Sequence, residues 1–218
     1  MIFGLSHAQL AYIAFGALWT VGLSAIAFIG GTVIGFILAL ARISPLSAIR
    51  APATFYIQII QGTPLIVMLF LMYFGLAVIG LDGLPAIMAA GIALILYSAA
   101  FLADIWRGCL QSVPKTQWEA AECLALSRYQ RMFRVILPQT LRIATPPTVG
   151  FLVQIVKDTS LASVIGFIEL AQAGKIVDNA VFRPFTVFLI IAFFYFVMCF
   201  PLSLWSRRLE RKLNVVGR

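Results

Sequence analysis

Long uncharged runs alternate with short basic segments along this chain. Residues 1–41 contain no Lys, Arg, Asp or Glu, and their most apolar part runs from Leu18 to Ala41. Further uncharged stretches cover residues 51–81, 84–103 and 184–206. Because roughly 20 apolar residues in helical form cross the hydrocarbon core of a bilayer, each of these four stretches predicts a transmembrane helix.

A fifth stretch is weaker. Residues 143–156 are uncharged, but they are few and they include Pro146 and Pro147. Proline lacks a backbone donor and disturbs the interior of a helix. We therefore expect this stretch to cross as a short, kinked or partly sheltered span.

The positions of the basic residues support a count of five helices. Thirteen of the 16 Lys and Arg residues follow the first, third or fifth predicted helix, whereas Lys157, Lys175 and Arg183 fall on the opposite side. Because basic loops stay in the cytoplasm, this distribution places the N-terminus outside and the C-terminus in the cytoplasm. A four-helix count that omits residues 143–156 would put the basic tail outside.

The composition agrees with one all-α integral membrane domain over residues 1–218. Hydrophobic residues make up 62% of the 218 positions and charged residues only 11%, against about 25% charged in a soluble domain. The formal charge of +8 would suggest a nucleic-acid partner in a soluble protein. Here the basic residues indicate the cytoplasmic side of the membrane instead. We therefore expect contact with the lipid bilayer and none with nucleic acid.

The residue types that catalysis or metal binding needs are sparse. His7 is the single histidine, and no second ligand stands at a useful spacing from it. Cys109 and Cys123 fall in the cytoplasmic segment and Cys199 in the last span, where a disulfide framework is not expected. The N-terminus has no basic segment before its apolar run, so we expect a retained helix rather than a cleaved signal peptide.

Five helices without an internal repeat are few to enclose a passage. We therefore expect a dimer with the passage at or near the subunit interface. Gly31 and Gly35 have the spacing that lets another helix approach closely, either within one subunit or between two.

The cytoplasmic loop at residues 107–142 carries the most informative pattern. Thr116 and Glu119 have the spacing of a capping box, which predicts a helix over about residues 116–127 with small alanines on one side. Such a helix suits docking into a groove of another protein, and the alternative is a solvated loop helix. Basic residues then recur every three positions among apolar ones, a pattern suited to the headgroup boundary, at Arg128, Arg131 and Arg134. We expect Pro138 to end or bend this segment.

The same loop resembles the EAA loop of ABC-importer permeases. That pattern is Glu-Ala-Ala, three residues, Gly, nine residues, Ile, one residue and Leu-Pro. It is matched in spacing by Glu119, Ala120, Ala121, Ala125, Val135, Leu137 and Pro138, with Ala125 in place of Gly and Val135 in place of Ile.

Four further segments resemble the polar amino-acid uptake permeases of the histidine, glutamine, arginine, glutamate and cystine type. They are Gln61-Gly62-Thr63-Pro64-Leu65, Ala100 to Ile105, Lys157-Asp158-Thr159-Ser160-Leu161 and Glu210 to Leu213, and the likeness runs from about residue 18 to 213. Gln61 stands where those permeases have Arg.

The resemblance implies the architecture of a type I ABC importer in a prokaryotic inner membrane. Two permease subunits, identical or different, would work with an ABC ATPase dimer and a periplasmic or extracellular amino-acid-binding protein. The coupling residues implied are Thr116, Glu119, Ala120, Ala121, Ala125, Leu137 and Pro138. No Gly-x-x-x-x-Gly-Lys-Ser/Thr occurs in the chain, so ATP and Mg are expected in the ATPase and no cofactor in this chain.

A polar substrate needs polar groups along an apolar passage. Gly62, Thr63 and Pro64, with Gln61, interrupt the second span, where freed carbonyls could face a cavity or simply form a packing kink. Lys157 and Asp158 could bind a zwitterion or form an ion pair at the outer rim.

Three more polar residues complete this candidate set. Thr159 and Ser160 could cap a helix or line the path. Asp104 is expected near the inner interface, with Arg107 as its partner. A permease for another small solute, or a stand-alone carrier or channel, remains an alternative at this point.

Overall fold

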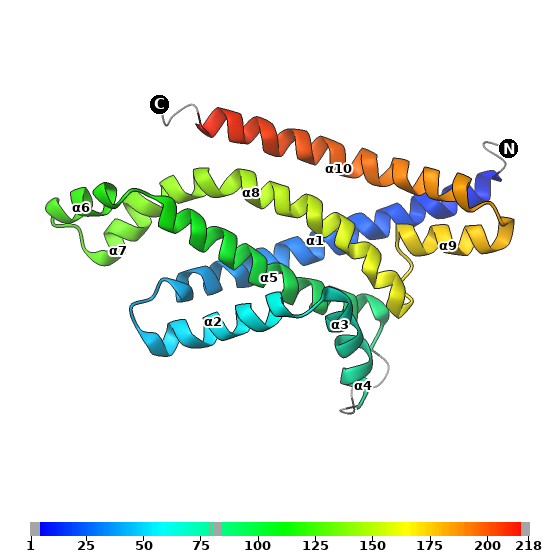
Figure 1. Cartoon of the computed structure of the whole chain (residues 1–218), viewed down its shortest axis with the longest axis horizontal. Coiled ribbons are helices and arrows are strands. Elements are labelled where there is room, and N and C mark those ends of the chain that lie inside the picture. The colour runs from blue at the N-terminus through cyan, green and yellow to red at the C-terminus, as the bar shows by residue number, and fades with distance from the viewer. Residues whose placement is uncertain (1–4, 79, 81–83, 215–218) are drawn as a thin grey trace.

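The computed structural model describes residues 5–78, 80 and 84–214. These residues form helices joined by short turns (Figure 1). In chain order the α-helices and the π and 3₁₀ segments are α1 (His7–Arg42), α2 (Ser47–Gly62), α3 (Leu65–Phe70), the π-helical η1 (Leu71–Gly75), α4 (Leu76–Val78), α5 (Ala86–Ser112), α6 (Lys115–Cys123), α7 (Arg128–Gln130), the π-helical η2 (Arg131–Ile136), α8 (Leu137–Asp158), the 3₁₀ segment η3 (Thr159–Ile165), α9 (Leu170–Val181) and α10 (Pro184–Asn214).

The prediction of about five apolar spans is confirmed. Four helical segments of the described chain are long and apolar enough to cross a membrane: α1, α5, the continuous stretch Arg128–Ile165, and α10 as far as Lys212. The pair α2 and α3–α4 gives a fifth span if its two bent halves count as one. The end of the predicted stretch at residue 81 lies outside the described residues.

The weak stretch at residues 143–156 lies inside α8, which runs through both prolines without a break. The hydroxyl of Ser206 in α10 donates to the carbonyl of Pro146 over 2.8 Å. This contact gives one carbonyl beside the prolines a partner from another helix. Of the three alternatives that the sequence leaves open, the structure supports a partly sheltered span, because the helix is neither short nor broken at the prolines.

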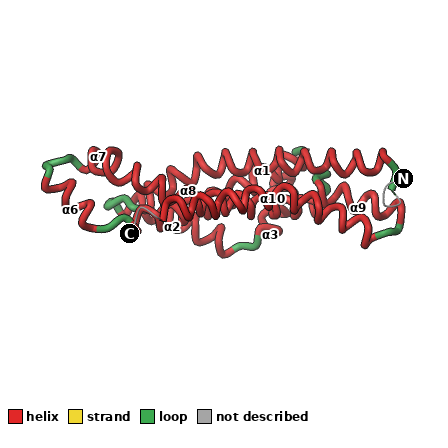
Figure 2. The backbone as a smooth tube through the Cα atoms, turned by 90° about the horizontal axis from the view of Figure 1, so that it is seen from above, coloured by secondary structure: helices red, strands yellow, loops and turns green. Residues whose placement is uncertain are grey.

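The basic segments share one end of the elongated molecule. The α1–α2 turn, α6, α7 and the C-terminal end of α10 lie together, whereas the start of α1, α9 and the α9–α10 turn lie at the opposite end (Figure 1). The long helices run along the same axis in the perpendicular view (Figure 2). This arrangement agrees with the topology that the basic residues predict, so the α6 end is called the cytoplasmic end below.

A seam of small residues joins α1 to α5. A Cβ added to Gly31 would lie 2.5 Å from the Cβ of Ser98, and one added to Gly35 would lie 2.9 Å from the carbonyl oxygen of Ala99. The two glycines therefore serve close packing within the subunit, which decides between the two alternatives that their spacing left open.

The second span breaks where the sequence predicts an interruption. Thr63 has extended backbone angles (φ −110°, ψ 129°), and the helix resumes at Leu65 after Pro64. The two halves meet at 103°, so α3 and α4 project sideways from the long axis (Figure 1). Leu65 and Leu69 of α3 are buried in the same apolar cluster as Ile155.

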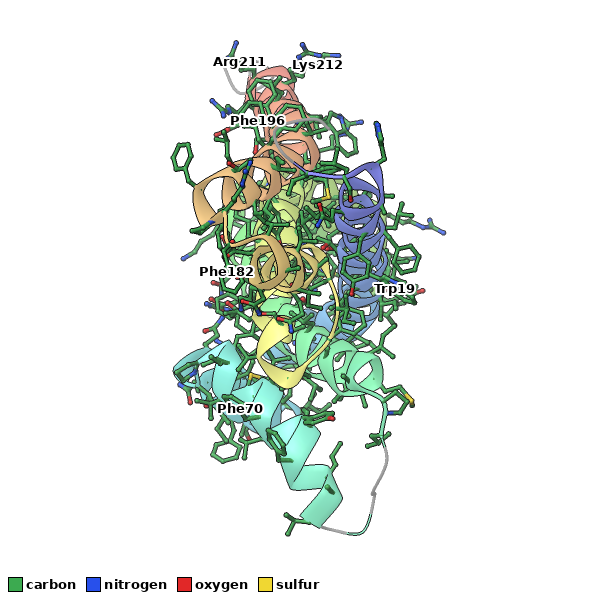
Figure 3. All side chains as sticks on the ribbon, turned by 90° about the vertical axis from the view of Figure 1, so that its right-hand side faces the viewer. Trp19, Phe70, Phe182, Phe196, Arg211 and Lys212 are labelled. Atoms are coloured by element: carbon green, nitrogen blue, oxygen red, sulfur yellow. The ribbon has the colours of Figure 1, made fainter. Side chains whose placement is uncertain are left out.

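Large apolar side chains cover much of the outer surface. Figure 3 looks along the bundle from the α9 end and shows Phe70 and Phe196 on opposite sides of it. Phe196 is 57% exposed and Phe185 is 82% exposed. Apolar surface on this scale requires lipid or protein around it.

Candidate functional site

The loop helix α6 forms at the cytoplasmic end, but not with the cap that its sequence predicts. It begins at Lys115 after Pro114, so Thr116 lies within the first turn and makes no capping bond. The predicted capping box of Thr116 and Glu119 is wrong, because a side chain inside the first turn is displaced from the capping position. The helix also ends at Cys123 rather than near Ser127.

The capping box of this loop belongs to the next helix. The amide of Gln130 donates to the hydroxyl of Ser127 over 3.3 Å, and the amide of Ser127 donates to the Gln130 side chain over 2.9 Å. These two bonds start α7 directly after the turn.

Ala125 makes the tight turn between the two helices. Its φ is +56°, in the left-handed region that favours glycine. The amide of Leu126 donates to the carbonyl of Ala121 over 3.3 Å, and that of Ala125 donates to Glu122 over 2.8 Å. This pair of bonds is a Schellman cap, which satisfies carbonyls at the end of α6. The turn therefore forms with alanine at the position where the EAA pattern has glycine.

One side of α6 is anchored and the other is free. Trp118 packs against a buried cluster that includes Leu110, Val113 and Ile136. Ala121 is only 2% exposed, so it supports the helix from beneath. The exposed residues on the opposite side include Thr116, Glu119, Ala120 and Cys123, and Leu124 directly after the helix is exposed too. A short helix with small exposed residues and a fixed base can enter a groove of another protein.

The chain returns from the loop as one continuous helix. Pro138 is exposed in the first turn of α8, and Leu137 beside it is half-buried. The helix continues through Pro138, so the expected helix end is not observed. The π-helical η2 directly precedes both residues, and its wider turn relieves the clash that proline makes with the preceding turn. The side chain of Gln139 donates to the carbonyl of Val135 over 3.0 Å.

Two of the three sets of candidate passage residues lie on elements that pack together. Residues 61–64 end α2 and lead into α3, while residues 157–160 join α8 to η3. Leu65 of α3 shares a buried cluster with Ala162 and Ile165 of η3. Gln61, Gly62 and Pro64 are exposed, and the hydroxyl of Thr63 donates to the carbonyl of Ile59 over 2.8 Å.

Asp158 is the least satisfied member of this region. One carboxylate oxygen accepts from the side chain of Gln154 over 2.8 Å, whereas the other, Oδ2, is buried without a partner in the described structure. No ion pair joins Lys157 to Asp158 among the described residues, so the expected rim pair is absent there. A buried carboxylate oxygen without a donor is suited to accept one from a ligand.

Thr159 and Ser160 bond to their own helix. Their hydroxyls donate to the carbonyls of Val156 (2.8 Å) and Lys157 (2.7 Å). Thr159 is fully buried. Of the two roles that the sequence left open, these bonds favour the helix end over the lining of a path.

Asp104 lies apart from these residues, toward the cytoplasmic end of α5. The Arg107 guanidinium approaches its Oδ1 to 2.9 Å, which confirms the predicted partner, and Arg42 at the end of α1 lies 3.9 Å away. Two arginines hold this carboxylate, so it ties α1 to α5.

Sequence reasoning missed the role of Glu169, which is fully buried outside the candidate spans. It accepts from the backbone amides of Ala171 and Gln172 (both 2.9 Å), from the hydroxyl of Tyr195 (3.0 Å) and from that of Thr20 (3.4 Å). Burial raises the pKa of its carboxyl group, and these four bonds oppose the rise. The only sign of this buried carboxylate in the sequence is the presence of isolated polar residues in apolar runs, such as Thr20.

Comparison with known proteins gives one consistent family. Residues 31–215 match the family described as binding-protein-dependent transport system inner membrane component. The chain is 40% identical to the probable amino-acid ABC transporter permease protein YckA of Bacillus subtilis, over 92% of this chain and 88% of that protein. It is 36% identical to the L-cystine transport system permease protein TcyB of the same organism, over 91% and 85%.

A solved structure agrees in fold and sequence. The crystal structure of an amino acid ABC transporter with histidines aligns with a TM-score of 0.88 and 33% identity, and it covers 93% of this chain and 94% of its own.

Proposed function

Because this chain belongs to the binding-protein-dependent transport system inner membrane components, we propose that it moves a polar amino acid inward as one of two permease subunits of an ATP-driven importer. The observation that carries this proposal is α6, a small-faced helix fixed at the cytoplasmic end in the position of the EAA pattern. Its partners are an ABC ATPase dimer, which holds ATP and Mg, a second permease subunit and an external amino-acid-binding protein.

Coupling starts at the exposed side of α6. Thr116, Glu119 and Ala120 contact the ATPase, because they are exposed and the small alanine allows close approach. Ala121 and Ala125 act indirectly, the first by packing beneath the helix and the second by turning the chain. Leu137 and Pro138 carry the movement into α8, since the helix passes through them without interruption.

The substrate passes near the break in the second span. In the described structure the carbonyls of Gly62 and Thr63 accept no backbone bond across the break, because the chain is extended at Thr63, whereas the carbonyl of Pro64 accepts from the amides of Val67 (3.0 Å) and Met68 (3.3 Å). The free oxygen of Asp158 offers an acceptor for an α-ammonium group at the neighbouring α8–η3 junction. A carbonyl-lined break beside one carboxylate suits a zwitterion better than an apolar solute.

The native cysteines test the coupling half of this proposal. Cys123 at the end of α6 is exposed, whereas Cys109 and Cys199 are buried. Maleimide labelling of Cys123 in the full chain should fall at least fivefold when the ATPase subunit is assembled, and uptake into vesicles should require that subunit. Unchanged labelling would contradict docking at α6, and uptake without the ATPase would indicate a stand-alone carrier.

Binding of labelled amino acid to the assembled transporter tests the passage. Asp158→Asn removes the charge at the free oxygen and should weaken binding by about tenfold, the cost of one charged hydrogen bond. Asp104→Asn is the matched control, because Asp104 is already held by two arginines, and it should leave affinity unchanged. Equal affinity in both variants would remove Asp158 from the path.

A further inference from the structure

A cavity of about 960 Å³ opens at the cytoplasmic end, beneath the loop helix. Its walls come from the α1–α2 turn, the end of α5, α6 and the α7–η2 segment. The lining is strongly basic, with a single carboxylate, Glu122, against five cations: Arg42, Arg50, Lys115, Arg128 and Arg131.

Two of these cations are already paired. Arg131 lies 3.1 Å from Glu122, and Arg42 lies 3.9 Å from Asp104. Within the described chain no carboxylate forms an ion pair with Arg50, Lys115 or Arg128. Arg50 is held in place by a bond of 3.1 Å from its guanidinium to the carbonyl of Ser44. Three positive charges therefore converge on one cavity without an internal anion to match them.

Apart from Ser44 and Gln111, the uncharged part of the cavity wall is apolar. Ile43, Leu110 and Val113 line it together with Trp118 and Met132, and these five belong to one hydrophobic cluster. A free inorganic phosphate would leave this wall unfilled. An amphiphile with an anionic head and an acyl chain would satisfy both parts of the lining.

The cavity lies where the spans meet the cytoplasm. α1 ends at Arg42 and α5 ends at Ser112, and both ends border the opening. On the adjacent turn, Leu46 is 61% exposed and Ile49 is 46% exposed, as residues in contact with acyl chains would be. Basic pockets on the cytoplasmic side of a helical bundle are suited to anionic lipid headgroups.

We propose that this cavity binds the phosphate headgroup of an anionic glycerophospholipid from the cytoplasmic leaflet. The site faces away from the docking surface of α6. Lys115, Trp118 and Glu122 share one face of that helix, whereas Thr116 and Ala120 lie on another. Lipid binding is therefore a property of this chain alone, and it does not depend on the proposed coupling.

Native mass spectrometry of the full chain in a neutral detergent tests the proposal. With equal amounts of phosphatidylglycerol and phosphatidylcholine, at least a fivefold excess of bound phosphatidylglycerol is expected. The double variant Arg50→Gln and Arg128→Gln should lower that binding at least fivefold. Arg207→Gln with Arg208→Gln removes two exposed charges from α10 and should change it by less than twofold.

Several outcomes would overturn the lipid site. Equal binding of both lipids, or an equal loss of binding in both double variants, would show that the lipid binds through general surface charge and not at this cavity. Displacement of the lipid by millimolar inorganic phosphate would show that free phosphate is the ligand. Loss of bound lipid on assembly with the ATPase subunit would show that the partner protein fills the cavity. Circular dichroism of each variant confirms that loss of binding does not reflect unfolding.

Discussion

Arg131 and Glu122 form an ion pair across the turn at Ala125, with 3.1 Å between Nη1 and Oε2. The pair joins the last turn of α6 to η2, so the loop helix is tied to the segment that continues into α8. The Glu122 side chain is 69% exposed, and an exposed pair contributes at most about 1 kcal/mol. Its effect is therefore on the orientation of α6 more than on stability.

Ala125→Gly should stabilise the chain. Ala125 holds a φ of +56°, and relief of that left-handed conformation is worth about 1 kcal/mol. Ala120→Gly, in the exposed helical part of α6, should instead cost about 1 kcal/mol. Thermal unfolding in detergent measures both, and the same sign for the two variants would contradict the strained turn.

Gly35→Ala should loosen the seam between α1 and α5. The new methyl group would lie 2.9 Å from the backbone oxygen of Ala99, so the two helices must separate at a cost of about 1–3 kcal/mol. Gly22 in the same helix has no neighbour within 4 Å of an added Cβ, so Gly22→Ala should be neutral or mildly stabilising. Equal thermal stability of the two variants would show that the seam tolerates added volume.

Glu169→Gln should flatten the dependence of stability on pH. Burial raises the folded-state pKa of Glu169 above its ordinary value, so the folded state holds this proton more tightly than the unfolded state. The stability that Glu169 contributes in this way is fully present below the ordinary glutamate pKa, and it is lost as the pH rises through the folded-state pKa. Melting temperatures of Glu169→Gln and of the unaltered chain, recorded from about pH 4 to about pH 8, give the two profiles of stability against pH.

The control for Glu169 is Glu210→Gln, which removes one exposed carboxylate from α10. Its profile should follow that of the unaltered chain. If Glu169→Gln also follows the unaltered profile, the buried carboxyl does not contribute to the pH dependence.

Glu119→Lys should uncouple the permease from the ATPase subunit. Glu119 is exposed on α6, so the change should alter stability by less than about 0.5 kcal/mol while it reverses the charge offered to the ATPase. We expect loss of substrate-stimulated ATPase activity and of uptake in reconstituted vesicles. Glu210→Lys makes the same charge change at an exposed site on α10, and equal loss in both variants would contradict a specific role for Glu119.

The long spans could be predicted because burial and lipid contact both select apolar residues. Gly62 and Pro64 also located the break in the second span. The 103° angle of that break could not be predicted, since it depends on how α3 packs with η3, a segment far along the chain. The same limit applies to Asp104, whose second partner, Arg42, comes from another helix.

The cap of the loop helix and the burial of Glu169 could not be predicted from local sequence. Thr116 has the capping spacing, yet Pro114 occupies the N-cap position of α6, and the capping box forms at Ser127 and Gln130. Glu169 gives no sign of burial in its own segment, because its partners Thr20 and Tyr195 lie on α1 and α10. When hydrogen-bond partners lie so far apart in the sequence, the only sign of their contact is an isolated polar residue within an apolar run.

The unbroken helix from Arg128 to Asp158 can transmit a tilt from the cytoplasmic end to the passage residues. Its 31 residues span about 45 Å at 1.5 Å per residue, with the α6 turn at one end and the free oxygen of Asp158 at the other. If it pivots as a rigid body about its cytoplasmic end, each degree of tilt moves the far end by roughly 0.8 Å. A few degrees at the membrane surface would then be enough to move the passage residues by the width of a water molecule.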